Sequence, residues 1–524
     1  MVPGMQRRRT CDRAAAMHDG DQGTEGPPEG GTAPPAEARR KGRPRRGERV
    51  TLRIDGLAAR GVGVGRADGF VLFVPGTAPG DRILAEVRVS KRRHGEAECL
   101  EVLEPGEARV QPRCPHFGRC GGCAWQHLSY AAQLREKEAM VRDSLERIGG
   151  FRDLPLRPIL AAPDPYHYRN KMEFAFHPEA ILGLHARGRF DEVVPIEACH
   201  IASPRVSALV AVVRDFVRRE GLPCYDKRTH GGLLRHLVVR EARSTGEILV
   251  GIVTTSDPFP KRGALRDALL GADPEIQSIV HAVNDDRADT VNVEALTVLH
   301  GRDHIVERLG GIPYEIRLQT FFQTHTVQAE RMVEEALALA EPAAGDLCVD
   351  LFCGVGTFAL HLAPHVAQVV GIEIVEAAVL AARQNARRAG MGNATFWVGD
   401  ARRTLPKVVE QLGTPDLFVL DPPRSGAGGK VMRRIGRCHP RRILYVSCNP
   451  ASLAADLKEL TPFGYEITAV QPLDLFPQTW HVETLVRLDR LQGAEAKPGP
   501  AVEADAGQDA GLRSEPESDA EPAP

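Results

Sequence analysis

The C-terminal part of the chain predicts an α/β protein with a mostly parallel, doubly wound sheet. From residue 323 onward, short apolar runs alternate with helical segments, a glycine motif follows the first run, and polar residues follow several others. Crossover helices between parallel strands produce this alternation. The expected strands are 347–352, 368–374, 394–400, 416–422 and 442–448, closed by an antiparallel pair within 465–490.

Two further folded regions precede this sheet. Residues 47–104 alternate short β-like runs with glycine turns, which predicts a small barrel of the oligonucleotide-binding type. Its basic loop SKRRHG (90–95) would either contact RNA or simply be solvated. Residues 105–320 predict a central α+β domain with a helix over 129–149. The doubly wound domain then occupies 321–490.

The two ends of the chain differ from the rest in composition. Residues 1–46 are rich in Pro, Gly, Ala and charge and cannot build a core, so we expect a disordered basic tail. Residues 491–524 predict a disordered acidic tail by the same argument. The net charge of −2 hides this asymmetry, because the acidic tail leaves the rest of the chain net basic. Such an excess is compatible with nucleic acid but does not identify it as the partner.

No apolar stretch approaches the length that spans a membrane, and Arg7, Arg8 and Arg9 are not followed by the apolar segment of a secretory signal. We therefore expect a cytoplasmic protein with no membrane partner and no obligate protein partner. Thiols stay reduced in the cytoplasm, so clustered cysteines indicate metal binding or catalysis rather than disulfides.

A nucleoside cofactor site is predicted at the start of the sheet. The first strand runs into DLFCGVGTF (350–358), whose glycines allow a tight turn and close approach to a ligand. Glu373 ends the next strand, where an acid can accept hydrogen bonds from two ribose hydroxyls. Asp400, after the third strand, could receive an adenine amino group. NAD and S-adenosylmethionine both fit this pattern.

The fourth and fifth strands end in chemically suggestive residues. DPPRSG (421–426) places Asp421 at a strand tip followed by a rigid loop, which is typical of nucleic-acid methyltransferases and not of dehydrogenases. YVSCNP (445–450) places Cys448 at the next tip, because Asn449 and Pro450 stop the strand. Ligands bind at these tips in open α/β sheets, although a buried structural thiol is the plain alternative for Cys448.

Four cysteines form a separate candidate site. CPHFGRCGGC supplies Cys114, Cys120 and Cys123, and Cys199 follows in EACHI. Four thiolates can hold a [4Fe–4S] cluster or a structural zinc ion, and the spacing leaves both open. The Cys-x3-Cys-x2-Cys spacing of radical enzymes is absent.

Taken together, these motifs resemble the RNA uracil-5-methyltransferase family, and specifically its bacterial iron–sulfur branch, which acts on 23S rRNA. The resemblance runs from about residue 47 to 490. It is carried by the TRAM-like barrel, CPHFGRCGGCAWQH with Cys199, FFQTHT, DLFCGVGTF, DPPRSG, YVSCNP and DLFPQTWHVE, in family order. It implies a class I methyltransferase sheet with an oligonucleotide-binding-like barrel and a central iron–sulfur domain.

The resemblance also implies roles for individual residues. Cys448 matches the nucleophile and Glu483 the base. S-adenosylmethionine would contact Gln323, Phe352, Thr357, Glu373, Asp400 and Asp421, although some relatives carry Asn where Thr357 and Asp400 stand. A [4Fe–4S] cluster with a structural or RNA-supporting role would be held by Cys114, Cys120, Cys123 and Cys199.

The expected activity is methylation of C5 of a uridine in 23S rRNA. Uracil C5 is too weak a nucleophile unaided, so a thiolate must add to C6 and a base must later remove the C5 proton. The target base must be unstacked to be attacked on its face. Three alternatives remain: the same chemistry on tRNA, a 5-methylcytosine enzyme, and a non-catalytic RNA-binding protein with a structural metal.

Overall fold

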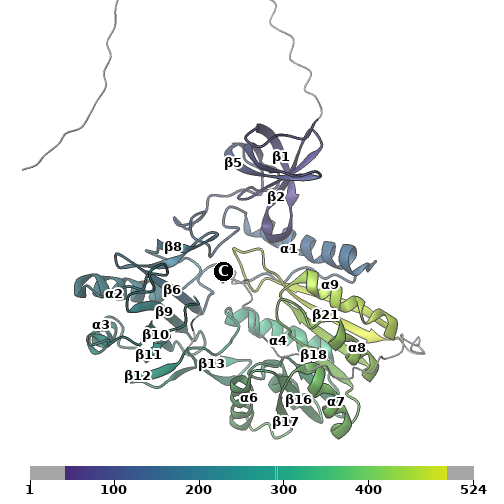
Figure 1. Ribbon diagram of the computed structural model, residues 1–524. Coiled ribbons are helices and arrows are strands. Elements are labelled where there is room, and N and C mark those ends of the chain that lie inside the picture. Colours follow the sequence, from purple (N-terminus) through teal and green to yellow (C-terminus); the bar gives the residue numbers. More distant parts are fainter. Residues whose placement is uncertain (1–41, 289–290, 292, 492–524) are drawn as a thin grey trace, which may run out of the picture. The chain divides into compact units, whose positions relative to one another are not determined.

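The computed structural model describes residues 42–288, 291 and 293–491. Both predicted tails fall largely outside these residues, the basic one up to residue 41 and the acidic one from residue 492. Among the described residues the strands form a closed barrel, two seven-stranded sheets and a two-stranded sheet (Figure 1). No helix in this part of the chain is long and apolar enough to cross a membrane.

The predicted N-terminal barrel is confirmed. Its strands run in the order β1-β2-β3-β5-β4. In β1 the alternating residues Val50, Leu52 and Ile54 are buried and fill the barrel, as a period of two requires. Residues 43–46, which composition assigned to the tail, lie against β4, where Arg43 donates to Ser90 Oγ at 2.9 Å. The strands are β1 (Arg49–Leu57), β2 (Gly63–Ala67), β3 (Phe70–Val74), β4 (Arg82–Ser90) and β5 (His94–Glu104).

The central region contains one seven-stranded mixed sheet in the order β12-β11-β10-β9-β6-β7-β8. The apolar runs LLRHLVVREA, EILVGIVTT and IQSIVHAVN form three neighbouring inner strands, β9, β10 and β11. Its elements are β6 (Lys171–His177), β7 (Ile181–Ala186), β8 (Arg189–Pro195), α2 (Pro204–Glu220), β9 (Leu234–Glu241), β10 (Ile248–Thr254), α3 (Arg262–Ala272), β11 (Ile276–Val283) and β12 (Ala295–Gly301).

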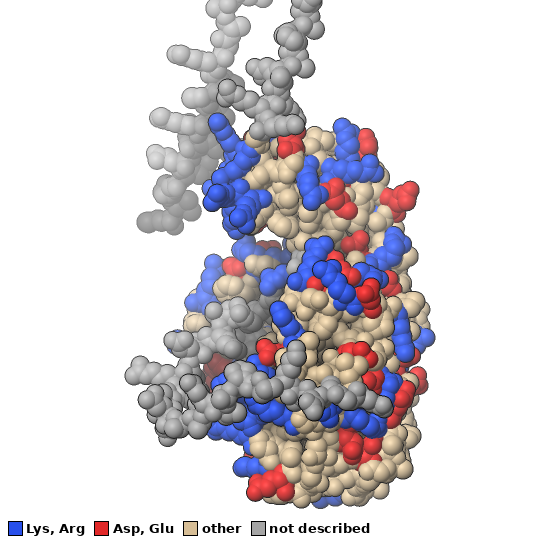
Figure 2. All heavy atoms as spheres, turned by 90° about the vertical axis from the view of Figure 1, so that its right-hand side faces the viewer, with Lys and Arg blue, Asp and Glu red and all other residues tan. Residues whose placement is uncertain are grey.

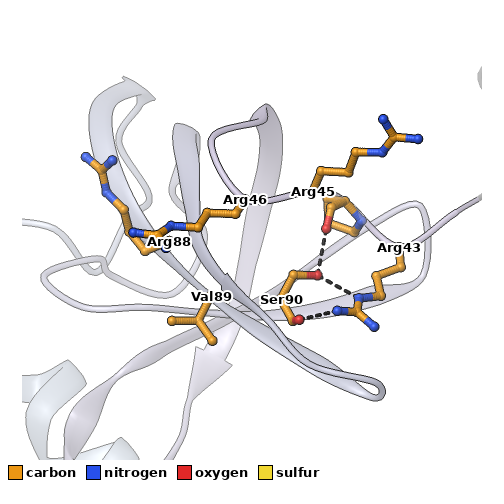
Figure 3. Close-up of a pocket in the computed structure, with 7 residues that line it drawn as sticks. Arg43, Arg45, Arg46, Arg88, Val89 and Ser90 are labelled. Atoms are coloured by element: carbon orange, nitrogen blue, oxygen red, sulfur yellow. Dashed lines mark hydrogen bonds between the residues drawn. The ribbon is translucent and has the colours of Figure 1, made fainter.

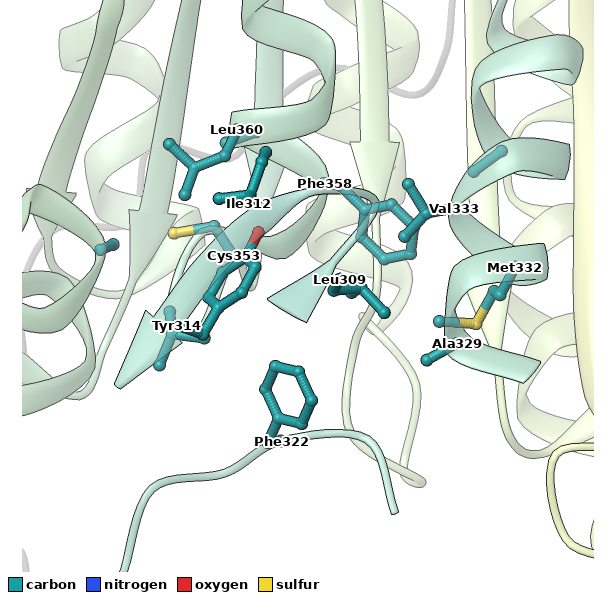
Figure 4. Packing of buried hydrophobic residues seen from close by; sticks show 14 of the residues in the cluster. Leu309, Ile312, Tyr314, Phe322, Ala329, Met332, Val333, Cys353, Phe358 and Leu360 are labelled. Carbon is teal, nitrogen blue, oxygen red and sulfur yellow. The ribbon is translucent and has the colours of Figure 1, made fainter. Parts of the chain in front are cut away.

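The middle strands of this sheet are buried on both faces. In β10, Ile248, Val250 and Ile252 pack with α2 and α3, whereas Leu249 and Val253 pack on the opposite side. That opposite core also contains the hairpin β13 (His304–Leu309) and β14 (Ile312–Arg317) and the helix α4 (Thr326–Ala340). Figure 4 shows part of it, with Tyr314 beside Cys353, Phe322 next to Tyr314, and Leu309 facing α4. One apolar core therefore joins the central sheet to the C-terminal one.

The C-terminal sheet has the predicted doubly wound topology. Its order is β17-β16-β15-β18-β19-β21-β20, in which the first five are parallel and β21 and β20 close the sheet antiparallel. Strand order reverses between β15 and β18, which is where such sheets bind ligands. The strands are β15 (Leu347–Leu351), β16 (Gln368–Glu373), β17 (Ala394–Val398), β18 (Leu417–Leu420), β19 (Arg442–Ser447), β20 (Tyr465–Leu473) and β21 (Glu483–Arg490).

Helices cover both faces of this sheet. One face packs against α4, α5 (Thr357–Leu362) and α6 (Glu376–Arg388). The other packs against α7 (Ala401–Leu412), α8 (Gly429–Cys438) and α9 (Pro450–Lys458). The predicted helix after the cysteine segment, α1 (Tyr130–Ser144), also joins this second face through Val141. Its N-cap is Ser129, whose side chain accepts a hydrogen bond from the amide of Ala132.

Candidate active site

Most of the predicted site residues lie at one edge of the sheet, at the carboxyl ends of its five parallel strands. Each residue lies at the end of its strand or one or two positions beyond it, because a polar side chain interrupts the apolar run there. The antiparallel strand β21 begins at the same edge. The residues brought together in this way are Phe352, Glu373, Asp400, Asp421, Cys448 and Glu483.

The loop after β15 has a constrained backbone. Phe352 has a φ of 64°, which is rare for a residue with a side chain and is typical of functional sites. Gly356 has a φ of 89°, and a Cβ there would meet the Phe396 ring at 3.1 Å, so both conformation and space require glycine. Thr357 follows as the first residue of α5. The loop can therefore bring its backbone close to a bound ligand.

Glu373 is held in place by two backbone amides. Gly354 donates to one carboxylate oxygen at 3.2 Å and Val375 to the other at 2.9 Å. Each oxygen keeps a further lone pair, so the half-buried carboxylate can still accept hydrogen bonds from a pair of hydroxyls.

Asp400 lines a surface pocket of about 320 Å³ together with Phe352 and the loop before α8. Its carboxylate caps α7 by accepting from the amide of Arg402 at 2.8 Å, and the Arg402 guanidinium also pairs with it. The Arg402 hydrogen bond lowers the pKa of Asp400. An adenine amino group would share this carboxylate with Arg402.

Gln323 is anchored from another part of the chain. Its carbonyl oxygen accepts a hydrogen bond from Asn170 Nδ2 at 2.9 Å, and Asn170 also donates through its amide to Thr324 at 2.9 Å. Those contacts fix the FFQTHT segment just before α4, with Phe322 buried in the shared core. They do not join the Gln323 side chain to the strand-end residues.

Cys448 and Glu483 continue a pair of neighbouring antiparallel strands. The register pairs Ser447 of β19 with Thr484 of β21, so Cys448 and Glu483 are the next residue outward on each strand. Cys448 is half-buried. Glu483 is only 3% exposed, and its Oε1 has no hydrogen-bond partner among the described residues. A buried carboxyl oxygen without a partner is costly and indicates a site built for a ligand.

The surroundings of Cys448, Asp421 and Glu483 favour the protonated form of each of these three side chains. Burial, reinforced by the Glu483 carboxyl, raises the pKa of the Cys448 thiol to about 12. Burial raises the pKa of Asp421 to about 7, and burial together with Asp421 raises that of Glu483 well above its ordinary value. Two neighbouring carboxyl groups in a partly buried site cannot both ionise easily. The pair therefore holds at least one proton near neutral pH.

The structure adds two residues to which the sequence assigned no role. Burial raises the pKa of the Cys448 thiol, and this rise is opposed by Arg424 of the DPPRSG loop. Its Nη2 also lies 3.3 Å from His481 Nε2, two residues before Glu483. The sequence motif contains this arginine, but only the fold shows that its side chain lies beside His481. Cys353, the other thiol near the cofactor loop, is buried in the core and is a structural residue by its surroundings.

The four predicted metal ligands converge on one region beside β7. The amide of Gly121 donates to His185 at 2.9 Å, and Arg187 donates to the Cys123 carbonyl at 2.6 Å, which ties the cysteine segment to this strand. Burial raises the pKa of Cys123 to about 12, and the other three thiols add to that shift. The four sulfurs are therefore close enough for the charge on one to affect the ionisation of another.

The donor chemistry of this region suits a group held by four thiolates. The amide of Gly122 donates to the Cys120 sulfur at 3.4 Å, a contact that would stabilise a thiolate ligand. In the part of the chain that the structure describes, however, no three His, Cys, Asp or Glu side chains stand at metal-ligand spacing. The cysteines therefore match such a group in the type of donor atom, but not in the spacing of their side chains.

The comparisons with known proteins agree with this architecture. A family model described as a methyltransferase domain matches residues 343–467, and a TRAM domain model matches residues 43–100. The chain is 38% identical over 471 residues to an uncharacterized RNA methyltransferase of Chlorobaculum tepidum, covering 86% of this chain and 98% of that protein. It is 39% identical over 451 residues to one from Caldanaerobacter subterraneus subsp. tengcongensis, covering 85% and 99%.

One solved structure is similar to this chain over most of its length. The tRNA (uracil-54, C5)-methyltransferase of Pyrococcus abyssi, in complex with S-adenosyl-L-homocysteine, matches with a TM-score of 0.69 and 29% identity over 84% of this chain and 99% of that one. The doubly wound sheet and its ligand edge thus define an S-adenosylmethionine-dependent methyltransferase. The chain belongs to the TRAM-domain RNA methyltransferases and is related to the RNA uracil-5-methyltransferases.

Proposed function

We propose that this protein transfers the methyl group of S-adenosylmethionine to C5 of a uridine in RNA. The observation that carries the proposal is the placement of Cys448 and Glu483 side by side at the ligand edge of the sheet. A 5-methyluridine reaction needs one nucleophile and one base on the same pyrimidine, and these two residues supply them. The similarity to a uracil C5 methyltransferase supports the same chemistry.

The proposed reaction divides one difficult step into easier ones. The Cys448 thiolate forms a bond to C6, and the C5=C6 π electrons move toward the ring carbonyl. Carbon 5 then attacks the sulfonium methyl group, whose bond to sulfur breaks and releases S-adenosylhomocysteine. Glu483 next takes the C5 proton, the double bond re-forms, and the C6–S bond breaks to return the thiolate.

The cofactor would bind at the strand ends on the β15–β16 side. In this proposal Glu373 receives the ribose hydroxyls, Asp400 the adenine edge, and Phe352 and Thr357 line the loop. Asp421 lies at the tip of β18, between β15 and β19, where it can face both the methyl donor and the uracil. Gln323 would approach from the segment before α4. We assign the [4Fe–4S] cluster to Cys114, Cys120, Cys123 and Cys199, where it would support the fold around the RNA rather than exchange electrons.

The barrel supplies a candidate contact for the RNA backbone. A surface pocket of about 500 Å³ is lined by Arg43, Arg45, Arg46 and Arg88 (Figure 3). Figure 2 shows Lys and Arg side chains gathered on one side of the barrel. Arg88 is already paired with Glu98, so the charge available to phosphates comes chiefly from the segment before β1. Phosphate contacts of this kind position RNA without reading its sequence.

Two RNA classes are candidate substrates. The barrel and the cluster cysteines favour 23S rRNA, by resemblance to the bacterial branch that carries both. The solved relative, which is named as a tRNA methyltransferase, favours tRNA. Mapping 5-methyluridine in both RNA pools from a deletion strain, with the intact gene restored as control, tests the proposal. Loss of one specific 5-methyluridine is expected, and an unchanged pattern in both pools would contradict the proposed activity.

A further inference from the structure

The base loop, residues 474–482, joins β20 to β21 and ends directly before the proposed base Glu483. It contains no helix or strand, yet all of its residues except Phe476 and Trp480 are buried. The backbone groups of a buried segment need hydrogen-bond partners, and regular structure does not supply them here. Other parts of the chain must therefore hold this loop.

The middle of the base loop is held by α1 and by the segment that follows the cysteines. Gln133 Nε2 of α1 donates to Gln478 Oε1 at 3.0 Å, and the Gln478 amide donates to Gln133 Oε1 at 3.0 Å. The Gln478 carbonyl oxygen accepts from the amides of Ala124 at 3.0 Å and Trp125 at 2.9 Å. Gln478 has a φ of 67°, a conformation that such surrounding contacts must hold. Its backbone is thus fixed on both sides of the Cα atom.

Hydrogen bonds inside the loop extend this fixed geometry toward Glu483. Thr479 Oγ1 donates to the carbonyl oxygen of Phe476 at 2.8 Å and accepts from the amide of His481 at 3.3 Å. Glu483 follows two residues later, and its Oε1 has no hydrogen-bond partner among the described residues. The position of this carboxyl group therefore depends on its backbone, which the base loop fixes on one side and β21 on the other.

Cys448 is positioned by different contacts. Its neighbour Asn449 donates through Nδ2 to the carbonyl oxygen of Arg424 at 2.9 Å, and Ser447 Oγ accepts from the Asn449 amide at 3.1 Å. Neither hydrogen bond involves the base loop. A change in the loop should therefore displace Glu483 and leave the thiol in place.

We propose that Gln133 and Gln478 are positioning residues, which hold the carboxyl group of Glu483 where it can remove the C5 proton. This inference rests on the proposed function above, because it concerns the last step of the same reaction. In that step the proton passes to the Glu483 carboxylate, the C5–H electrons re-form the C5=C6 bond, and the C6–S electrons return to Cys448. A displacement of about 1 Å can cost a reacting group about 100-fold in rate. The pair therefore acts on proton removal and not on addition or methyl transfer.

The loop itself is tested first, without RNA or cofactor. Gln133→Met fills a similar volume without a donor or acceptor, and Gln478→Gly suits the positive φ while removing the side chain. Hydrogen–deuterium exchange should become faster in residues 474–482 of both variants. Val213→Ala, in the core of the central sheet, is the control that loosens the protein elsewhere. Unchanged exchange in the base loop of both glutamine variants would overturn the proposal.

The reaction step is tested with the 23S rRNA or tRNA transcript whose 5-methyluridine is lost in the deletion strain. In both glutamine variants turnover should fall about 10- to 100-fold, and a methylated adduct at Cys448 should accumulate. Deuterium at uridine C5 should slow turnover of these variants further, because proton removal then limits the rate. With 5-fluorouridine RNA, whose trapping needs no proton removal, the adduct should form at near the wild-type rate.

Two results of this second test would overturn the proposal. Unchanged turnover would show that the pair does not position the base. Equal losses in turnover and in 5-fluorouridine trapping would show that the pair only supports the fold. A wild-type protein that forms neither 5-methyluridine nor an adduct would reject the proposed reaction and the positioning role with it, and faster exchange would then assign the pair to holding the loop alone.

Discussion

Cys448 and Glu483 each lie one residue beyond the Ser447–Thr484 pair that ends the β19–β21 ladder, so the register of the two strands directs them toward each other. Residues opposite each other on neighbouring antiparallel strands have Cβ atoms about 4.5–5.5 Å apart. A pyrimidine ring placed against this edge would therefore meet a thiol and a carboxyl group together. The two residues are 35 positions apart in sequence, and the antiparallel closing strand brings them together.

The cofactor assignment predicts a loss of affinity in Glu373→Ala. The carboxylate already has two amide donors, so it is preorganised, and its removal should weaken S-adenosylmethionine binding by about 1–3 kcal/mol. Titration calorimetry measures this directly. Glu376→Ala, an exposed residue at the start of α6, is the control. Unchanged affinity in Glu373→Ala would remove the residue from the ribose contact.

The acid pair predicts a pH-dependent cost in stability. Asp421 has a folded-state pKa of about 7 against an ordinary value of 3.8, so the unfolded chain releases its proton first as pH rises. Stability at this position is therefore lost between about pH 4 and 7. Asp421→Asn should stabilise the protein by about 1–2 kcal/mol at pH 8, a figure discounted because the residue is half-exposed.

Denaturant unfolding across pH 5–8 checks this prediction. The gain in unfolding free energy from Asp421→Asn should grow from pH 5 to 7 and level off above pH 7. Above that pH, Asp421 of the wild type is ionised in both the folded and the unfolded protein. An advantage that is constant over this range would show that Asp421 does not titrate as inferred.

The cluster assignment predicts that anaerobically purified protein is brown and contains iron and sulfide in matched amounts. Cys120→Ser should bleach it, because that sulfur is among the four candidate ligands. Cys438→Ser, in the last turn of α8 and away from the cysteine segment, should leave the colour unchanged. Iron and sulfide analysis with absorption spectra is the measurement. Colourless protein with stoichiometric zinc would reject the cluster and leave the methyltransferase assignment intact.

The arginine pocket predicts a change in salt dependence. If Arg45 and Arg46 each contact a phosphate, changing either to Gln should make the slope of log affinity against log salt shallower by about 0.7 for single-stranded RNA. Fluorescence anisotropy at several salt concentrations gives the slope. Arg66→Gln, whose partner on the barrel is Asp55, is the control. Equal slopes in all variants would place RNA binding elsewhere.

Sequence patterns predicted the barrel and the doubly wound sheet because both follow from periodicity and turn residues. They also located the strand-end residues, since parallel strands bring their carboxyl ends to one edge. They could not show that β13, β14 and α4 share a core with the central sheet, because that packing depends on contacts between distant segments. Arg424 was missed for a related reason. Its partner His481 lies 57 positions further along the chain, in the segment before β21, and no local signal links the two residues.

The central claim is the covalent cycle, and the measurement that tests it most directly is an RNA–protein adduct on denaturing gels. Glu483→Gln should still add to C6 and transfer the methyl group, then stall because the C5 proton stays. A methylated adduct at Cys448 should therefore accumulate with Glu483→Gln and be absent with Cys448→Ala, and 5-fluorouridine RNA should trap the wild type likewise. Turnover by Cys448→Ala, or a fluorinated RNA that never cross-links, would contradict the account, and an adduct at Cys353 would assign the nucleophile to the other thiol.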